Sequence, residues 1–331
     1  MRPAWAKRAS DASSASGSSD GRPGWAKRSR VLKRPSGQPA LQHKCLPRAW
    51  TPDTLAERLE CGLPRWWKQL LLGVMATAWS MPLIVGLEVF SGCEALSESF
   101  RTYVGPFLSF DIVSDPENDI LTMAGLERLA VWILRIGRHG YVHLGTPCKS
   151  WIALSRAWSK RSMMAPQGPG RNRTNPKQWA YLQEHNAIGH ITAYIVRTAH
   201  ALDLSYTIEQ PVSSLLFSFD PVLKALAATG FVTAAFTMGS FGGESPKPLL
   251  LKGSAPWLRT FREVALKRKA ESTPPTKRLT TTTSSGFTGQ KGDLDASSGY
   301  TCAFGVAVAL ACLGLGSDEV CAQLKRLGFH P

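Results

Sequence analysis

From residue 83 to residue 237 the chain alternates short apolar runs typical of β-strands with longer segments of helical periodicity. When a helix follows each strand, the chain returns to its starting edge and the strands pair in parallel. The pattern predicts an α/β fold with a Rossmann-like, doubly wound, mostly parallel sheet. The predicted strands are 83–90, 106–112, 141–145, 205–209 and 231–237, and the predicted helices are 94–103, 121–137, 176–202 and 221–229.

Composition divides the rest of the chain. Residues 1–50 hold eleven Lys/Arg and two Asp/Glu, a net charge of +9 out of the formal +15, among Ser, Gly and Pro. Such a segment buries too little apolar surface to offset the entropy of ordering. We expect a disordered basic tail over 1–62, an α/β domain over 63–260, a low-complexity basic linker over 261–296, and C-terminal helices over 297–331 that complete the domain.

Cysteine usage and basic clusters bear on location. The seven cysteines are an odd number, form no C-x-x-C pair and show no zinc-type spacing, which favours a reducing compartment and no metal site. Two basic clusters within 266–278 (LKRKAESTPPTKR) are typical of a nuclear-import signal or a phosphate-contacting loop. We expect a nuclear protein, with an organelle or the cytoplasm as the alternative.

One segment raises the question of a membrane. Residues 69–87 are uncharged over nineteen positions and follow the aromatic and basic flank RWWK. Pro82 divides the segment, however, and its second half continues into the first predicted strand. We favour a packed helix followed by a buried strand, and keep a membrane anchor as the alternative.

Three predicted strands end in residues suited to chemistry. The first ends at the small-residue turn Ser91-Gly92, the third leads into Cys148 through the motif GTPC, and the fourth ends at Glu209. Ligands of open α/β sheets bind beyond the carboxyl ends of the strands, and a small-residue turn lets a cofactor approach a helix N-terminus. We therefore expect one cleft that holds these groups.

The motifs LEVFSG, FDI, DI, GTPC and IEQP, in this order, resemble those of the DNA (cytosine-5) methyltransferase family. The resemblance covers residues 83–256, and residues 298–311 are similar to the family's C-terminal helix, which completes the cofactor pocket. It implies an S-adenosyl-L-methionine-dependent enzyme that methylates C5 of cytosine in DNA, or in RNA.

The resemblance also implies the cofactor site. Phe90, Ser91 and Gly92 would line it, with Phe90 against the adenine, and Asp111 would accept hydrogen bonds from the ribose hydroxyls. Asp119 matches the position that contacts the adenine amine. For Asp119 the alternative is a helix cap, because a predicted helix begins just after it.

By the same resemblance, Cys148 is the nucleophile and Glu209 holds the cytosine. Addition of a thiolate at C6 turns the ring into an enamine whose C5 can attack a sulfonium methyl group. Glu209 would donate a proton as charge develops on the ring, which requires a pKa raised by burial. The alternatives are a buried, inert Cys148 and an ion pair between Glu209 and a loop arginine.

A long basic loop follows Cys148 over residues 159–177. A cytosine in a duplex must be flipped out before reaction, which calls for groups that grip the backbone. The alternative is a solvated charged loop without this role. We assign the task to four basic side chains in the loop or just before it: Arg156, Arg161, Arg171 and Arg173.

Several positions depart from the family pattern. Cys93-Glu94-Ala95 stand where a further glycine pair is usual, Gln210-Pro211 stand in place of Asn-Val, and the arginine pair expected near Phe236 is missing. Residues 248–297 leave little space for a target-recognition domain, so we expect weak sequence specificity. The alternative function is a catalytically inactive, nucleic-acid-binding relative derived from a mobile element.

Overall fold

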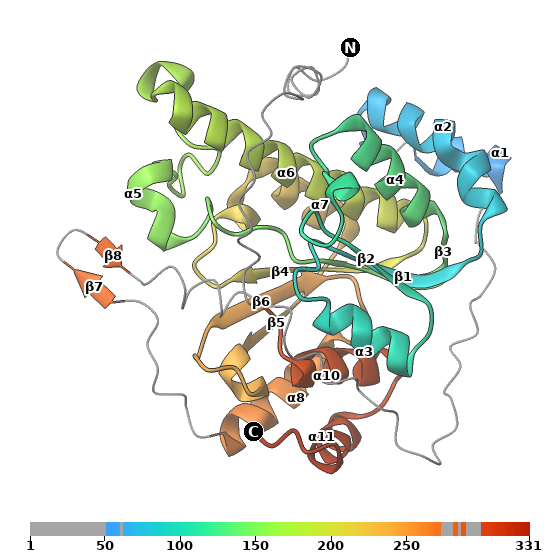
Figure 1. Cartoon of the computed structure of the whole chain (residues 1–331), viewed down its shortest axis with the longest axis vertical. Coiled ribbons are helices and arrows are strands. Elements are labelled where there is room, and N and C mark those ends of the chain that lie inside the picture. Colours follow the sequence, from blue (N-terminus) through green and yellow to red (C-terminus); the bar gives the residue numbers. More distant parts are fainter. Residues whose placement is uncertain (1–50, 60–61, 273–280, 284–285, 289–298) are drawn as a thin grey trace.

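The computed structural model describes residues 51–59, 62–272, 281–283, 286–288 and 299–331 (Figure 1). Its centre is a six-stranded sheet in the order β2-β1-β3-β4-β6-β5. All strands run in one direction except β6, which pairs antiparallel with β4 and with β5. The strands are β1 (Ile84–Val89), β2 (Phe107–Phe110), β3 (Ile136–Leu144), β4 (Ser205–Pro211), β5 (Val232–Thr237) and β6 (Pro248–Gly253). The predicted α/β class with a mostly parallel sheet is confirmed.

Helices cover both faces of this sheet, which explains why its central strands are nearly continuous apolar runs. Every residue of β1 is buried. In Figure 1, one layer lies above the sheet and a second below it. The upper layer holds α2 (Arg65–Ser80), α4 (Met123–Leu134), α6 (Pro176–Ala201) and α7 (Asp220–Thr229), and the lower layer holds α3 (Ala95–Tyr103), α8 (Leu258–Glu271), α10 (Cys302–Cys312) and α11 (Ser317–Arg326).

Each face has its own apolar core. Leu87, Val89 and Val142 point into the upper core. Val85 and Tyr141, at alternate positions of the same strands, point into the lower core with Phe304 of α10. The C-terminal helices therefore belong to the same folded unit as β1.

The predicted helix over 121–137 is too long at its C-terminal end. It ends at Leu134, and β3 begins two residues later at Ile136. The apolar residues around this junction fit both periods, so periodicity did not separate helix from strand. Gly140, expected to end the helix, lies within β3, where a hypothetical Cβ would be 2.6 Å from the carbonyl oxygen of Val85.

Two of the predicted low-complexity ranges contain ordered elements. Residues 1–50 lie outside the described residues, but α1 (Pro52–Arg58) occupies part of the predicted tail, and Thr51 forms a capping box with Thr54. The predicted linker over 261–296 begins inside α8, and β7 (Thr281–Thr283) pairs with β8 (Gly286–Thr288). Both corrections extend the folded part of the chain.

The first basic cluster of the predicted nuclear-import segment lies on α8 and is partly structural. Arg268 is buried, and its guanidinium donates hydrogen bonds to the carbonyl oxygens of Ser240, Phe329 and His330. Lys267 pairs with Asp318 at 2.6 Å. These side chains tie α8 to the C-terminal segment.

The apolar segment that raised the membrane question forms α2 and the start of β1, as favoured above. Among the helices of the described residues, none is long and apolar enough to cross a membrane.

Candidate functional site

The loop that carries Cys148 leaves the carboxyl end of β3 and is fixed to the neighbouring strand. Gly145 N–H continues the pairing by donating to Val89 O at 3.0 Å. The buried Gln210 side chain of β4 donates from Nε2 to Thr146 O, and its Oε1 accepts from Ser214 Oγ at 2.7 Å. Gln210, one of the departures from the family pattern, thus holds the cysteine loop in place.

Cys148 and Glu209 lie near each other at this edge of the sheet. Their strands are neighbours, with His143 of β3 paired with Thr207 of β4. Burial, and then the negative charge of Glu209, raise the pKa of the Cys148 thiol to about 11. The structure therefore brings together the two residues to which the sequence assigned catalysis.

Lys247 is a third charged group at this place, and the sequence analysis missed it. Its ammonium group lowers the pKa of both Cys148 and Glu209, against the larger effect of burial. It lies directly before β6 with a φ of 27°, an unusual backbone conformation for lysine. Lys247 is positioned by β6, the antiparallel strand between β4 and β5, which the sequence analysis did not predict.

One carboxyl oxygen of Glu209 has a hydrogen-bond partner, and the other has none among the described residues. Oε2 accepts a hydrogen bond from the Tyr300 hydroxyl at 3.2 Å. Oε1 is buried and has no hydrogen-bond partner within the part of the chain that the structure describes. Burial raises the pKa of Glu209, while Lys247 and then Tyr300 lower it. A partly desolvated carboxyl group of this kind is suited to hold and donate a proton.

The residues to which the sequence assigned cofactor binding form a turn with an unusual backbone. Phe90, Gly92 and Glu94 all have positive φ, of 63°, 53° and 58°. Two of these residues carry side chains, so the turn keeps a conformation that favours glycine despite the strain. The Glu94 carboxylate forms an ion pair with Arg101 of α3 at 2.9 Å.

The surroundings of this turn fit a polar ligand. A hypothetical Cβ on Gly92 would meet no atom within 4 Å, so the space beside it is open. Ser91 Oγ and Asn118 Oδ1 are buried and lack a hydrogen-bond partner among the described residues. Asp111 binds the turn itself, because its Oδ2 accepts from Gly92 N–H at 2.9 Å.

The predicted role of Asp119 remains a prediction, and the structure adds a local role. Its Oδ1 accepts from Leu121 N–H at 2.9 Å, whereas Thr122 is the residue that caps α4.

Glu88 of β1 was not singled out in the sequence. It is fully buried, and its Oε2 accepts from both Ser97 N–H and Ser97 Oγ, which fixes the first turn of α3. Burial raises the pKa of Glu88 to about 8.

Arg161 is a structural residue, which corrects its assignment to nucleic acid. Its guanidinium is buried over the Trp151 ring, 3.7 Å from the centroid, and donates to Asn186 Oδ1 at 2.8 Å and to Pro166 O. Arg156 and Arg171 are exposed, as the prediction requires. The Arg173 side chain lies outside the description.

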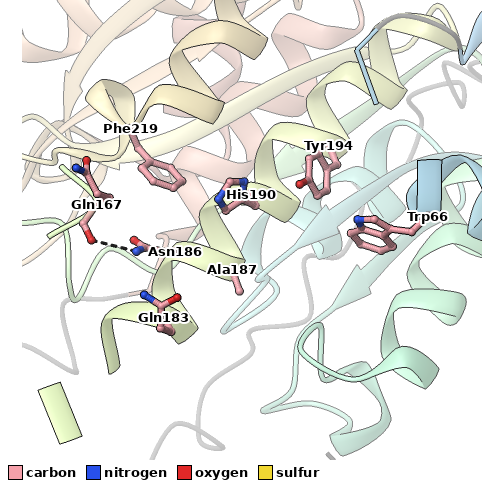
Figure 2. Close-up of a pocket in the computed structure, with 8 residues that line it drawn as sticks. All are labelled: Trp66, Gln167, Gln183, Asn186, Ala187, His190, Tyr194 and Phe219. Carbon is pink, nitrogen blue, oxygen red and sulfur yellow. Dashed lines mark hydrogen bonds between the residues drawn. The ribbon is translucent and has the colours of Figure 1, made fainter. Parts of the chain in front are cut away.

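A separate pocket of about 340 Å³ lies on the outer side of α6 (Figure 2). Trp66 of α2 and Phe219, just before α7, stand at its ends, and His190 and Tyr194 line it between them. Neither Cys148 nor Glu209 lines this pocket.

The described residues contain no cluster of His, Cys, Asp or Glu that could hold a metal ion. Comparison with known protein families and with curated proteins finds no match.

Proposed function

We propose that this protein is an S-adenosyl-L-methionine-dependent methyltransferase that acts on C5 of cytosine in DNA, with Cys148 as nucleophile. The observation that carries the proposal is the meeting of Cys148 and Glu209 at the carboxyl edge of adjacent parallel strands. The open turn around Gly92 follows β1, the neighbour of β3 in the same sheet, and supports a cofactor site at that edge.

In this mechanism the sulfur of Cys148 adds to C6 of the cytosine, and Glu209 donates a proton to N3 as negative charge develops on the ring. C5 then carries the electron density needed to attack a methyl group. The bound cofactor supplies that methyl group as an electrophilic sulfonium. Loss of the C5 proton to solvent, departure of the sulfur as a thiolate and return of the N3 proton to Glu209 restore the aromatic ring.

The two groups assist each other through their charges. An ionised Glu209 raises the pKa of Cys148, so a protonated Glu209 removes one obstacle to thiolate formation. Lys247 stabilises the thiolate in the same place. The pair therefore reacts in the form with one proton on Glu209 and none on Cys148, although a thiol pKa of about 11 favours the proton on the sulfur in the free site.

The cofactor would be held by the residues around Gly92. The open space admits a ligand, and Ser91 Oγ and Asn118 Oδ1 offer unused hydrogen-bonding capacity. Asp111 keeps the turn in shape, and Asp119 lies on the following loop. Arg156 and Arg171 remain the groups for the nucleic-acid backbone, and a nuclear location is part of the proposal.

A covalent trap tests the reaction. With DNA that carries 5-fluorocytosine and with added S-adenosyl-L-methionine, the protein should form an adduct that survives denaturation, because fluorine at C5 blocks the elimination. Cys148→Ser should abolish the adduct, and the matched control Cys321→Ser, on α11, should retain it. Absence of the adduct from the unaltered protein would refute the enzyme proposal.

A second candidate is a relative that binds cofactor and nucleic acid without turnover. The pKa of about 11 at Cys148, which keeps the sulfur protonated near neutrality, favours it, as does Glu94 in a glycine-like conformation. Calorimetric titration with S-adenosyl-L-methionine separates the two. Binding that Asp111→Ala weakens, together with no adduct and no effect of Cys148→Ser, would select this candidate.

A further inference from the structure

A chain of hydrogen bonds leads from the protein core to Glu209. Tyr300 Oη lies 3.2 Å from Glu209 Oε2 and 3.0 Å from His143 Nε2. On the other side of the imidazole, His143 Nδ1 lies 2.8 Å from Thr207 Oγ1 and 3.0 Å from Tyr141 Oη. The other four members of this chain of hydrogen bonds come from β3, from β4 and from the residue before the cap of α10.

The chain has a preferred direction. Burial lowers the pKa of His143 to about 3, so its ring is neutral and carries one N–H. If that hydrogen is on Nε2, the Nε2–H group donates to the Tyr300 hydroxyl oxygen. Nδ1 then accepts a hydrogen bond from the hydroxyl group of Thr207 or Tyr141. Tyr300 then has its own hydrogen left for Glu209 Oε2. All members of the chain are satisfied in this arrangement.

We propose that Tyr300, held by His143, is a positioning residue that occupies Oε2 of Glu209 and leaves Oε1 as the oxygen that carries a proton to the substrate base. The inference rests on the proposed function. Its geometric basis is the division of the carboxyl group between a bound Oε2 and a buried Oε1 that has no partner among the described residues. Without Tyr300 the carboxyl group can rotate, and the proton can sit on either oxygen.

Other charged groups around Glu209 set the background for its titration. Lys247, before β6, favours the charged carboxylate, whereas Cys148 competes with it for negative charge. The Tyr300 hydroxyl also favours the carboxylate, and its own pKa is raised well above its usual value by burial and then by Glu209. Removal of the Tyr300 hydroxyl therefore raises the pKa of Glu209.

The test uses Tyr300→Phe in the full chain, with Tyr206→Phe as the matched control. Tyr206 is a buried tyrosine of β4, and its hydroxyl bonds to Thr229 Oγ1 and Gly230 O instead of to the site. The carboxyl titration of Glu209 is read by infrared difference spectroscopy, as the band that Glu209→Gln removes. In Tyr300→Phe this band should titrate at higher pH, and in Tyr206→Phe it should not move.

Activity gives the second readout. We expect Tyr300→Phe to lower kcat about tenfold, with a small change in KM. An unmoved Glu209 band in Tyr300→Phe would overturn the inference. A shifted band without methyl transfer in the unaltered protein would refute the proposed function and leave the positioning role intact.

Discussion

At the scale of single residues, the site differs from the sequence-based picture mainly in protonation. Position in the motifs identified Cys148 and Glu209, but burial determines what each group does. A cysteine with a pKa of about 11 is a thiol near neutral pH, and its reactivity depends on the charge of the neighbouring carboxyl group. Mutation of Glu209 should therefore change the pKa and the reactivity of the Cys148 thiol.

Glu209→Gln should speed the alkylation of Cys148 by iodoacetamide between pH 9 and 11. The carboxylate raises the pKa of the thiol, so a neutral side chain lowers this pKa and increases the thiolate fraction at each pH. Peptide mapping by mass spectrometry gives the rate at each cysteine. Cys93, which is exposed, serves as the internal control and should react equally in both proteins. Equal rates at Cys148 would show that the two side chains do not interact.

Arg161 and Arg156 should differ sharply in their effect on stability. Arg161→Ala would leave Asn186 Oδ1 without its donor and open a cavity beside Trp151, with an expected loss of about 3 kcal/mol in the free energy of unfolding. Arg156→Ala removes an exposed side chain and should cost less than about 0.5 kcal/mol. Urea unfolding measures both. A loss below about 1 kcal/mol for Arg161→Ala would contradict its structural role.

At the scale of elements, helix α10 connects Tyr300, which lies just before it, with α3, the helix that follows the turn around Gly92. Thr301 caps the helix by accepting from Phe304 N–H, and its hydroxyl donates to Phe241 O at 2.7 Å. The cap fixes the chain just before the helix, where Tyr300 lies. Gly305 lets the same helix approach α3, because a hypothetical Cβ there would be 2.5 Å from Ala95 O. Helix α3, which follows the turn around Gly92, is thus packed against the helix that begins just after Tyr300.

Gly305→Ala and Gly73→Ala should change stability in opposite directions. Both glycines lie inside helices, where alanine is favoured by about 1 kcal/mol. At Gly73 of α2 no atom lies within 4 Å of the new methyl group, so this gain should appear in full. At Gly305 the methyl group meets backbone of α3, and we expect a net loss of about 2 kcal/mol. Thermal unfolding monitored by circular dichroism decides, and two changes of the same sign would contradict the close packing.

Elements were predictable where a single pattern decided them. β1, β2 and β4 end within a few residues of the expected positions because each is an apolar run bounded by turn residues. α8 was missed because its charged surface positions resemble a linker, although Phe261 and Val264 are buried. Tyr300 and His143 could not be found in this way, since their meeting depends on a contact across 157 positions of the chain.

At the scale of the whole molecule, the sheet joins two cores into one folding unit. The upper core extends from α1 to α7, and the lower core draws residues from Val85 to Leu324. The predicted boundary at residue 260 therefore falls inside the packed structure. Helix α10 is buried at every position from Ala303 to Ala311, although a low-complexity stretch separates it from α8.

A chain that ends at residue 298 should fail to fold. It lacks Phe304, Val306, Val308 and Leu310, each of which contributes about 2 kcal/mol of apolar burial, against a net stability of about 5–15 kcal/mol for a typical domain. The full chain should unfold in urea in one transition that is the same by tryptophan fluorescence and by far-UV circular dichroism. The shortened chain should show no cooperative transition and should elute as an expanded or aggregated species in size-exclusion chromatography. A cooperative transition in the shortened chain would mean that residues 63–260 form an independent domain, and the lower core would then be an interface between two units.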